Sequence, residues 1–190
     1  MLQLLEQRIK TDGRVRPGNI LIVDSFLNHQ MDVALFNEMG RETKRIYQDC
    51  EVTKILTIES SGIGIACVTA QFFDCPVVFA KKNKTKNIAD DVFRSVAKSF
   101  THGGEYDIIV NRRYLSEGDR VLLIDDFLAE GNAMVALIDI CRQAGAVPVG
   151  CTCAIEKGFQ HGADRIRALG VPVNSLAVVR SMEDGDIVFG

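Results

Sequence analysis

Two adjacent carboxylates, Asp125 and Asp126, have the clearest chemical potential in this chain. They follow an apolar run at residues 121–124, and a short turn at 127–132 carries Gly131. Apolar residues then recur at helical spacing, so we predict a short buried strand, an acidic pair at its end, a tight loop and a helix. A loop that opens a helix leaves backbone N–H groups directed outward, and these favour a bound anion.

Phosphate suits this loop because its oxygens accept several hydrogen bonds, and Gly131 lets the backbone approach closely. The helix dipole contributes only about 0.3–1 kcal/mol per charge, so the N–H donors must do most of the holding. Ionised carboxylates only accept hydrogen bonds and therefore match sugar hydroxyls or a hydrated cation. The pattern alone fits a phosphorylated sugar, or an ordinary polar strand end followed by an ordinary turn. It is neither a Walker A loop nor a dinucleotide fingerprint.

The length and composition of the chain limit what else it can be. Its 190 residues predict one domain, residues 1–190, and its net charge of −3 argues against a general nucleic-acid binder. No apolar run approaches the length of a membrane span, and the N-terminus has no signal-peptide pattern. We therefore expect a cytoplasmic protein without a nucleic-acid or membrane partner.

The cysteines lie mostly in apolar segments, which predicts buried free thiols. They are Cys50, Cys67, Cys75, Cys141, Cys151 and Cys153. Cys151 and Cys153 are expected on one face of a strand. No metal site is predicted from them, because no His or second Cys pair stands at zinc spacing.

The elements that position the acidic pair alternate between strands and helices. We predict helices at residues 1–9, 33–50, 63–73 and 133–145, with a short one around 166–169. We predict strands at 20–23, 54–58, 77–80, 92–101, 106–110, 121–124, 147–155, 175–179 and 187–189. The alternation predicts an α/β fold, with a mostly parallel sheet covered on both faces.

Ligands of such folds bind beyond the carboxyl ends of the strands. Residues 59–62, 81–82, 125–133 and Lys157 all fall at such ends. The strands at 92–101 and 106–110 are expected to form an antiparallel excursion. Residues 81–91, which begin with a basic stretch, are either a plain surface loop or a mobile flap over the site.

The segment VLLIDDFLAEGNA resembles the phosphoribosyl-diphosphate (PRPP) signature of type I phosphoribosyltransferases. Many members carry a Thr and two glycines in the loop, where this chain has Ala-Glu-Gly-Asn-Ala at 129–133. Three other segments, VDSFLNHQ, TIESSGI and IEK followed by FQ, resemble the bacterial xanthine-specific branch of that family. The resemblance spans most of the chain. It implies the type I fold, with an antiparallel flap and a small hood formed by the N-terminal and C-terminal segments.

The resemblance also implies roles for individual residues. Asp125 and Asp126 become the catalytic pair, and Leu21, Asn28 and Lys157 bind the purine. The PRPP-binding residues are Ala129, Glu130, Gly131, Asn132, Ala133, Ser60, Ser61, Gly62 and Lys82. The turn at 59–62, which alone reads as an ordinary strand-to-helix connection, becomes the pyrophosphate loop.

Hydrogen-bond chemistry bears on the base. A lysine only donates, so Lys157 suits a purine with a 6-carbonyl and suits the 6-amino group of adenine badly. Leaving such a buried group unpaired costs about 1–3 kcal/mol. Asn28 both donates and accepts, so it can meet a 2-carbonyl but does not by itself exclude guanine. Without the resemblance, Lys157 reads as a surface lysine and Asn28 as a loop amide.

We therefore expect a pentosyltransferase of purine salvage that converts xanthine and PRPP to XMP and pyrophosphate. Mg²⁺ is expected to arrive mainly on PRPP, with no metal site in the protein, and the family implies a homodimer. The alternatives are an adenine or hypoxanthine/guanine phosphoribosyltransferase and a PRPP-sensing regulator. Lys157 counts against adenine. A sensor needs a DNA-binding module, and no basic helix-turn-helix segment is visible.

Overall fold

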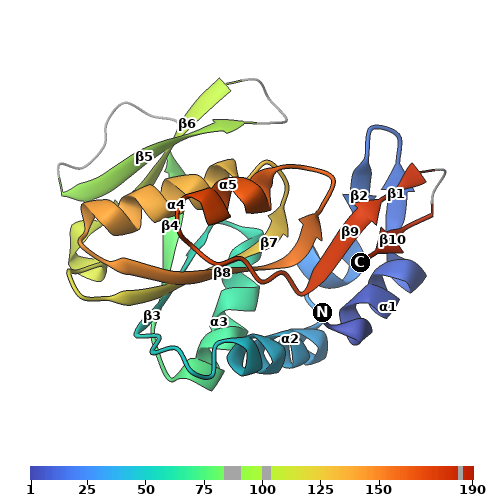
Figure 1. Cartoon of the computed structure of the whole chain (residues 1–190), viewed down its shortest axis with the longest axis horizontal. Coiled ribbons are helices and arrows are strands. Elements are labelled where there is room, and N and C mark those ends of the chain that lie inside the picture. The colour runs from blue at the N-terminus through green and yellow to red at the C-terminus, as the bar shows by residue number, and fades with distance from the viewer. Residues whose placement is uncertain (84–90, 100–103, 184–185) are drawn as a thin grey trace.

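The computed structural model describes residues 1–83, 91–99, 104–183 and 186–190. Within these residues the central sheet has eight strands in the order β10-β9-β8-β7-β3-β4-β6-β5 (Figure 1). Neighbours from β9 to β4 run parallel, and β10, β6 and β5 run antiparallel to their neighbours. The strands are β3 (Lys54–Ile58), β4 (Val77–Asn83), β5 (Val92–Ser99), β6 (Gly104–Asn111), β7 (Arg120–Leu128), β8 (Val147–Lys157), β9 (Ala177–Ser181) and β10 (Val188–Phe189).

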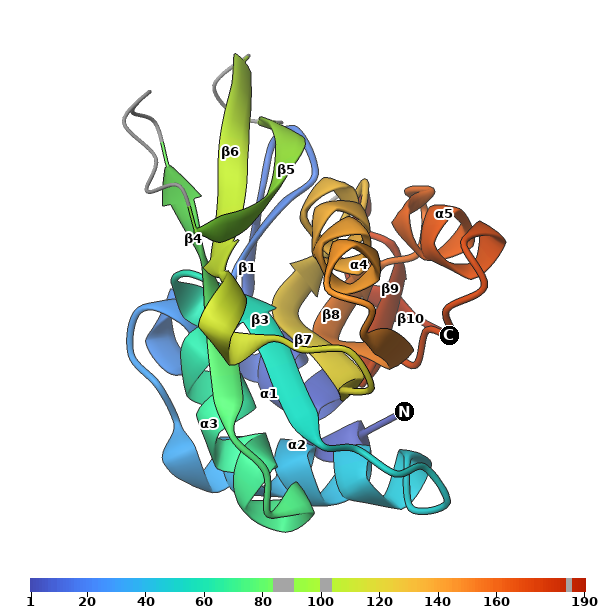
Figure 2. The same cartoon turned by 90° about the vertical axis from the view of Figure 1, so that its left-hand side faces the viewer.

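Helices cover both faces of this sheet, as Figure 2 shows. One face packs α1 (Gln3–Asp12), α2 (Val33–Ile46) and α3 (Ser61–Phe73), and the other packs α4 (Asn132–Gln143) and α5 (Gly162–Ala168). Alternate side chains of β7 point to opposite faces of the sheet. Leu122 packs in the core on the α2–α3 side, and Leu123 packs in the core on the α4 side. The predicted α/β fold with a covered, mostly parallel sheet is confirmed.

The start of α2 and the end of α4 are each marked by a capping interaction. The Asp32 side chain accepts a hydrogen bond from Leu35 N at 3.1 Å and caps the start of α2. Gly145 takes a φ of 72° just beyond α4, and Ala146 N bonds back to Cys141 O at 2.9 Å. An acidic cap therefore fixes where α2 begins, and a glycine with positive φ fixes where α4 ends.

The N-terminal and C-terminal segments meet at one end of the sheet (Figure 1). Leu2 N donates to Leu176 O at 2.7 Å, and Lys10 Nζ lies 5.4 Å from the centroid of the Phe189 ring. Between α1 and α2 the chain forms a hairpin, β1 (Arg14–Arg16) and β2 (Ile20–Ile22), and then a π-helical turn (Asp24–Asn28). We did not predict β1, because three residues next to a helix end carry too little pattern.

The strand that carries the acidic pair is longer than predicted. We placed its end at residue 124, whereas β7 continues to Leu128 and pairs Asp125 with Cys153 of β8. The predicted turn at 127–132 is wrong at its start for the same reason. Polar residues continue this strand because the neighbouring β8 runs on to Lys157 and supplies backbone partners.

The prediction of a loop at 81–91 is wrong for its first residues. β4 continues to Asn83, and Lys81 and Lys82 pair with Ile109 and Ile108 of β6. The rest of the predicted flap, residues 84–90, lies outside the described residues. The antiparallel pair formed by β5 and β6 is confirmed.

All six cysteines are free thiols, but only three are buried. Cys141, Cys151 and Cys153 lie in the core on the α4 side, with Cys151 and Cys153 on the one strand face predicted. Cys50 and Cys75 are half-buried and Cys67 is exposed, so the prediction of burial is wrong for Cys67. It lies on the outward side of α3. Among the described residues, no helix combines the length and the apolar character that crossing a membrane requires.

Candidate active site

The acidic pair lies where three segments meet at the carboxyl end of the parallel strands. Asp125 is buried on β7, and Asp126 beside it is half-buried. The first residues of α3 pack against the pair, since a Cβ placed on Gly62 would lie 2.8 Å from Asp125 Oδ1. Adjacency of β3 and β7 in the sheet produces this contact. The structure thus brings together the 59–62 loop and the acidic pair that the sequence predicted.

The electrostatics of the pair are asymmetric. Burial, followed by the negative charge of Asp126, raises the pKa of Asp125 well above its usual range. Asp125 Oδ1 accepts a hydrogen bond from Asp126 N at 2.9 Å, and Asp126 Oδ1 accepts one from Phe127 N at 3.0 Å. The hydrogen bond from Asp126 N orients the Asp125 carboxyl and opposes the rise in its pKa, but burial and the neighbouring charge outweigh it, so the protonated form is favoured. A developing positive charge or a cation nearby would favour the ionised form.

The 129–133 loop lies directly after β7 and ends in the first turn of α4. Gly131 has a φ of 76°, which a side chain would disfavour, and α4 begins with no side-chain cap. Gly131 packs against Gly162, the first residue of α5, because a Cβ on Gly131 would lie 3.0 Å from Gly162 Cα. The side chain of Arg165 on α5 donates to Asn132 Oδ1 at 2.8 Å and to the Glu130 carbonyl.

The antiparallel strands contribute two further groups. Tyr106 on β6 lines one hollow together with Asp125 and the 129–133 loop. Burial, and then the nearby Asp125, raise the pKa of its phenol. Lys82 on β4 places its Nζ 5.9 Å from the Tyr106 ring centroid, while its backbone N–H donates to the side chain of Glu59. The Glu59 carboxylate thus ties the 59–62 loop to the strand that carries Lys82.

The residues assigned to the purine lie on the α1–α2 side of the sheet. Leu21 is buried in β2, and Lys157 at the end of β8 is half-buried. Lys157 Nζ donates to the Asn19 carbonyl at 2.9 Å, and burial lowers the pKa of its ammonium group. Asn28 is exposed at the end of the π-helical turn, and among the described residues it forms no hydrogen bond with Lys157.

Three residues at this site were not predicted from the sequence: Tyr106, Asn19 and Arg165. Tyr106 stands in a strand whose alternation explains it without a site. Asn19 follows Gly18, and the positive φ of both residues, 58° and 86°, marks a tight turn. The Gly-Asn pair is the one feature of the sequence that could have drawn attention to Asn19. It predicts a hairpin turn and not a contact with Lys157. Arg165 belongs to a short charged helix and carries no motif.

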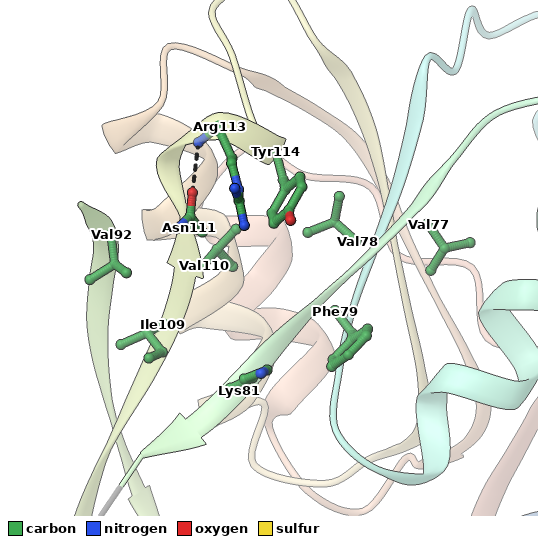
Figure 3. A pocket seen from close by; sticks show the side chains of 10 residues that line it. All are labelled: Val77, Val78, Phe79, Lys81, Val92, Ile109, Val110, Asn111, Arg113 and Tyr114. Atoms are coloured by element: carbon green, nitrogen blue, oxygen red, sulfur yellow. Dashed lines mark hydrogen bonds between the residues drawn. The ribbon is translucent and has the colours of Figure 1, made fainter. Parts of the chain in front are cut away.

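A separate hollow lies between β4 and β6, away from the predicted residues. Figure 3 shows its lining, in which Phe79, Lys81 and Ile109 stand on these two strands and Arg113 and Tyr114 follow β6. None of the residues that line it was assigned to a substrate, although Lys81 belongs to a strand end at which ligands were expected. The candidate site is therefore the hollow formed by Tyr106, Asp125 and the 129–133 loop.

Comparison with known proteins places this geometry in a family. Residues 32–181 match the family model described as phosphoribosyl transferase domain. A xanthine phosphoribosyltransferase from Lachnoclostridium phytofermentans is 55% identical over 190 residues, covering 99% of this chain and 98% of the relative. One from Bifidobacterium longum is 53% identical over 191 residues, covering 99% of each.

Solved structures share the fold at much lower identity. APRTase from Giardia lamblia complexed with 9-deazaadenine has a TM-score of 0.79 at 21% identity, covering 95% of this chain and 99% of that one. Adenine phosphoribosyltransferase from Saccharomyces cerevisiae has a TM-score of 0.74 at 18% identity, covering 92% and 99%. The expected type I fold is thereby confirmed, and the match across residues 32–181 includes both loops and the acidic pair. The chain therefore belongs to the phosphoribosyl transferase family.

Proposed function

We propose that this chain transfers the phosphoribosyl group of PRPP to xanthine, giving XMP and pyrophosphate. The observation that supports the transfer is the close approach of Gly62 to Asp125, because it brings the 59–62 loop to the acidic strand end that the 129–133 loop directly follows. A sugar with a phosphate at one end and a diphosphate at the other matches two such loops. The choice of xanthine rests on relatives of that name at 51–55% identity along nearly the whole chain.

Each part of PRPP is assigned to one loop or strand end of the candidate site. The 129–133 loop holds the 5-phosphate through its backbone N–H groups and the Asn132 side chain, and the helix start of α4 adds a favourable dipole. Ser60, Ser61 and Gly62, together with Lys82, hold the pyrophosphate. Asp125 and Asp126 accept hydrogen bonds from the ribose hydroxyls. Tyr106 covers this hollow from the antiparallel strands.

The proposed base pocket lies between β8 and the β1–β2 hairpin. Lys157 Nζ already donates to Asn19 O, so it is oriented toward the hairpin that carries Leu21. An ammonium group that is half-buried is well placed to donate to a 6-carbonyl. Asn28 is the proposed partner of the 2-carbonyl. It is exposed in the structure, so this assignment implies that the base buries it.

The reaction joins N9 of the base to C1 of the ribose while the bond from C1 to pyrophosphate breaks. Positive charge develops on the ribose ring, and the carboxylates of Asp125 and Asp126 are placed to stabilise it. The N9 proton passes to solvent, since xanthine is acidic for a purine, and no residue is assigned as general base. Catalysis on this proposal is mostly positioning and electrostatics.

Mg²⁺ is proposed to arrive on PRPP. It prefers oxygen ligands, keeps several waters and is bound through substrate phosphates and one or two carboxylates. The Asp125–Asp126 pair offers such oxygens, and Asp126 is the more accessible of the two. When bound, the ion would offset the negative charge of the departing pyrophosphate.

A base panel tests the proposal. The protein is incubated with PRPP, Mg²⁺ and either xanthine, guanine, hypoxanthine or adenine, and nucleotide formation is followed. The expected result is strongest turnover with xanthine. Turnover led by adenine would overturn the base pocket but keep the PRPP site. PRPP binding without turnover on any base would favour a sensor.

Three expectations remain predictions beside the proposed activity. They are a single domain over residues 1–190 with a hood made by the terminal segments, a homodimer, and a cytoplasmic location. Sedimentation of the purified protein tests the dimer, and limited proteolysis tests the single domain.

A further inference from the structure

We propose that Arg165 is a positioning residue for the 5-phosphate of PRPP. This inference rests on the proposed function, in which the 129–133 loop holds that phosphate. Arg165 Nη1 donates both to Asn132 Oδ1, at 2.8 Å, and to the backbone carbonyl of Glu130. One guanidinium nitrogen thus donates hydrogen bonds to the residues on either side of Gly131.

The chemistry of these bonds fixes which way the Asn132 amide faces. A guanidinium has donors and no acceptor, so the group that meets Arg165 must be the amide oxygen. The amide N–H₂ is consequently the half of the group that faces away from Arg165. Asn132 is the first residue of α4, so this donor accompanies the backbone N–H groups of the helix start.

Few side chains in the 129–133 loop can donate a hydrogen bond to phosphate. Residues 129–133 read Ala-Glu-Gly-Asn-Ala, and α4 has no side-chain cap. Asn132 is the one residue in the loop whose side chain can donate a hydrogen bond to phosphate at neutral pH. An orienting partner for it therefore affects the affinity for PRPP directly.

Arg165 is held on a rigid support. α5 packs its first residue against the loop, since a Cβ on Gly162 would lie 2.8 Å from Gly131 N. Ala163 and Ile166 of α5 are buried in the core beneath α4. Arg165 is three residues after Gly162 and so shares its side of the helix. The guanidinium reaches the loop from an element that is already fixed to it.

Arg167 on the same helix provides a matched control. It is exposed and pairs with Asp164 within α5, with Arg167 Nη1 3.3 Å from Asp164 Oδ1. Arg167→Ala removes the same charge from the same helix without altering a contact to the loop. Arg165→Lys keeps the charge of Arg165 but replaces the planar fork with a single ammonium group.

The test measures the Kd for PRPP, the KM for each substrate and the melting temperature of each variant. Arg165→Ala is expected to raise the Kd for PRPP by about tenfold or more, with the KM for xanthine unchanged. Arg165→Lys should recover part of the affinity, and Arg167→Ala should match the wild type. In an Asn132→Ala background, the effect of Arg165→Ala should shrink, because the two residues act together.

The outcomes separate this inference from the proposed function. An unchanged Kd for PRPP in Arg165→Ala would overturn the positioning role, and so would equal losses in Arg165→Ala and Arg167→Ala. Absence of PRPP binding in the wild type would instead overturn the proposed function. If Arg165→Ala fails to fold, the Kd for PRPP is compared between Arg165→Lys and Arg167→Ala. A higher Kd in Arg165→Lys supports the positioning role, and equal values overturn it.

Discussion

Gly62 lies against Asp125, so closely that a Cβ on the glycine would come within 2.8 Å of Asp125 Oδ1. The same Cβ would lie 2.3 Å from the buried Thr57 hydroxyl oxygen. The start of α3 can approach β7 only because position 62 has no side chain. This contact sets the spacing between the 59–62 loop and the acidic pair, and with it, on our proposal, the distance available for the ribose of PRPP.

Gly62→Ala is therefore expected to damage catalysis more than folding. The added methyl group must push either the loop or the Asp125 carboxylate away, and a shift of about 1 Å in a positioned group can lower the rate about 10²-fold. Overpacking of this kind costs about 1–3 kcal/mol of stability. Steady-state kinetics measures the fall in rate, and thermal melting measures the loss of stability. A variant with normal kcat/KM for PRPP would show that the contact does not position the substrate.

Asp125→Asn tests the catalytic assignment. The asparagine keeps the oxygen that accepts from Asp126 N but cannot carry the negative charge that stabilises a cationic ribose. We expect kcat to fall by about 10² or more at saturating PRPP and xanthine. Asp164→Asn, a change of the same kind on the exposed side of α5, serves as control. Near-normal turnover of Asp125→Asn at saturating PRPP would remove Asp125 from the mechanism.

The same substitution is expected to stabilise the protein near neutral pH. Burial and the charge of Asp126 raise the pKa of Asp125, so the folded state binds its proton more tightly than the unfolded state, where Asp titrates near about 3.9. As pH rises from about 3.9 to the raised pKa, the unfolded state releases this proton while the folded state keeps it, so the free energy of unfolding falls. Above the raised pKa the loss of stability remains constant. Asn avoids this penalty. Melting temperature should rise in Asp125→Asn at about pH 7.5, and the gain should vanish near pH 3.

The sequence predicted which segments lie together at the candidate site better than it predicted where the strands end. Asp125 and the 129–133 loop were predicted because strand, loop and helix follow one another locally, whereas Gly62 was predicted through the family resemblance. The end of β7 was misplaced, since its last residues are held by β8, which the sequence places some thirty residues away. Tyr106, Arg165 and Asn19 reach the site or its pocket only through the fold. Arg165 and Asn132, for example, stand 33 residues apart.

Lys157→Met tests the base pocket. The substitution keeps the apolar stem but removes the ammonium group that donates to Asn19 O and, on our proposal, to the 6-carbonyl of xanthine. We expect the KM for xanthine to rise roughly tenfold while the Kd for PRPP stays unchanged. Lys10→Met, at the lysine beside Phe189, is the control. If the Kd for PRPP rises instead, Lys157 binds PRPP and not the purine.

The pH dependence of base binding provides a second check on Lys157. Burial lowers the pKa of its ammonium group, so the charge is lost at a lower pH than the value of about 10.4 usual for lysine. Affinity for xanthine through Lys157 is present below the lowered pKa and should weaken as pH rises through it. Lys157→Met should lack this alkaline decline. Titration of xanthine affinity in both proteins measures the difference, and identical profiles would contradict the assignment.

Gly162→Ala tests whether α5 fixes the shape of the 129–133 loop. A Cβ at this position would lie 2.1 Å from the Ala129 carbonyl oxygen and 2.8 Å from Gly131 N, both backbone atoms that cannot rotate away. Either α5 or the loop must move, at a cost of about 1–3 kcal/mol, which corresponds to roughly 2–4 °C of melting temperature per kcal/mol in a chain of this size.

The functional result distinguishes the two movements. If the loop moves, the Kd for PRPP rises while xanthine affinity is kept, which is the outcome we expect because Ile166 anchors α5 in the core. If α5 moves, Arg165 loses Asn132, and adding Arg165→Ala causes no further loss. Ala168→Ser, a small change at an exposed position of α5, should alter neither quantity. Normal PRPP affinity in Gly162→Ala would mean that the loop keeps its binding geometry without support from α5.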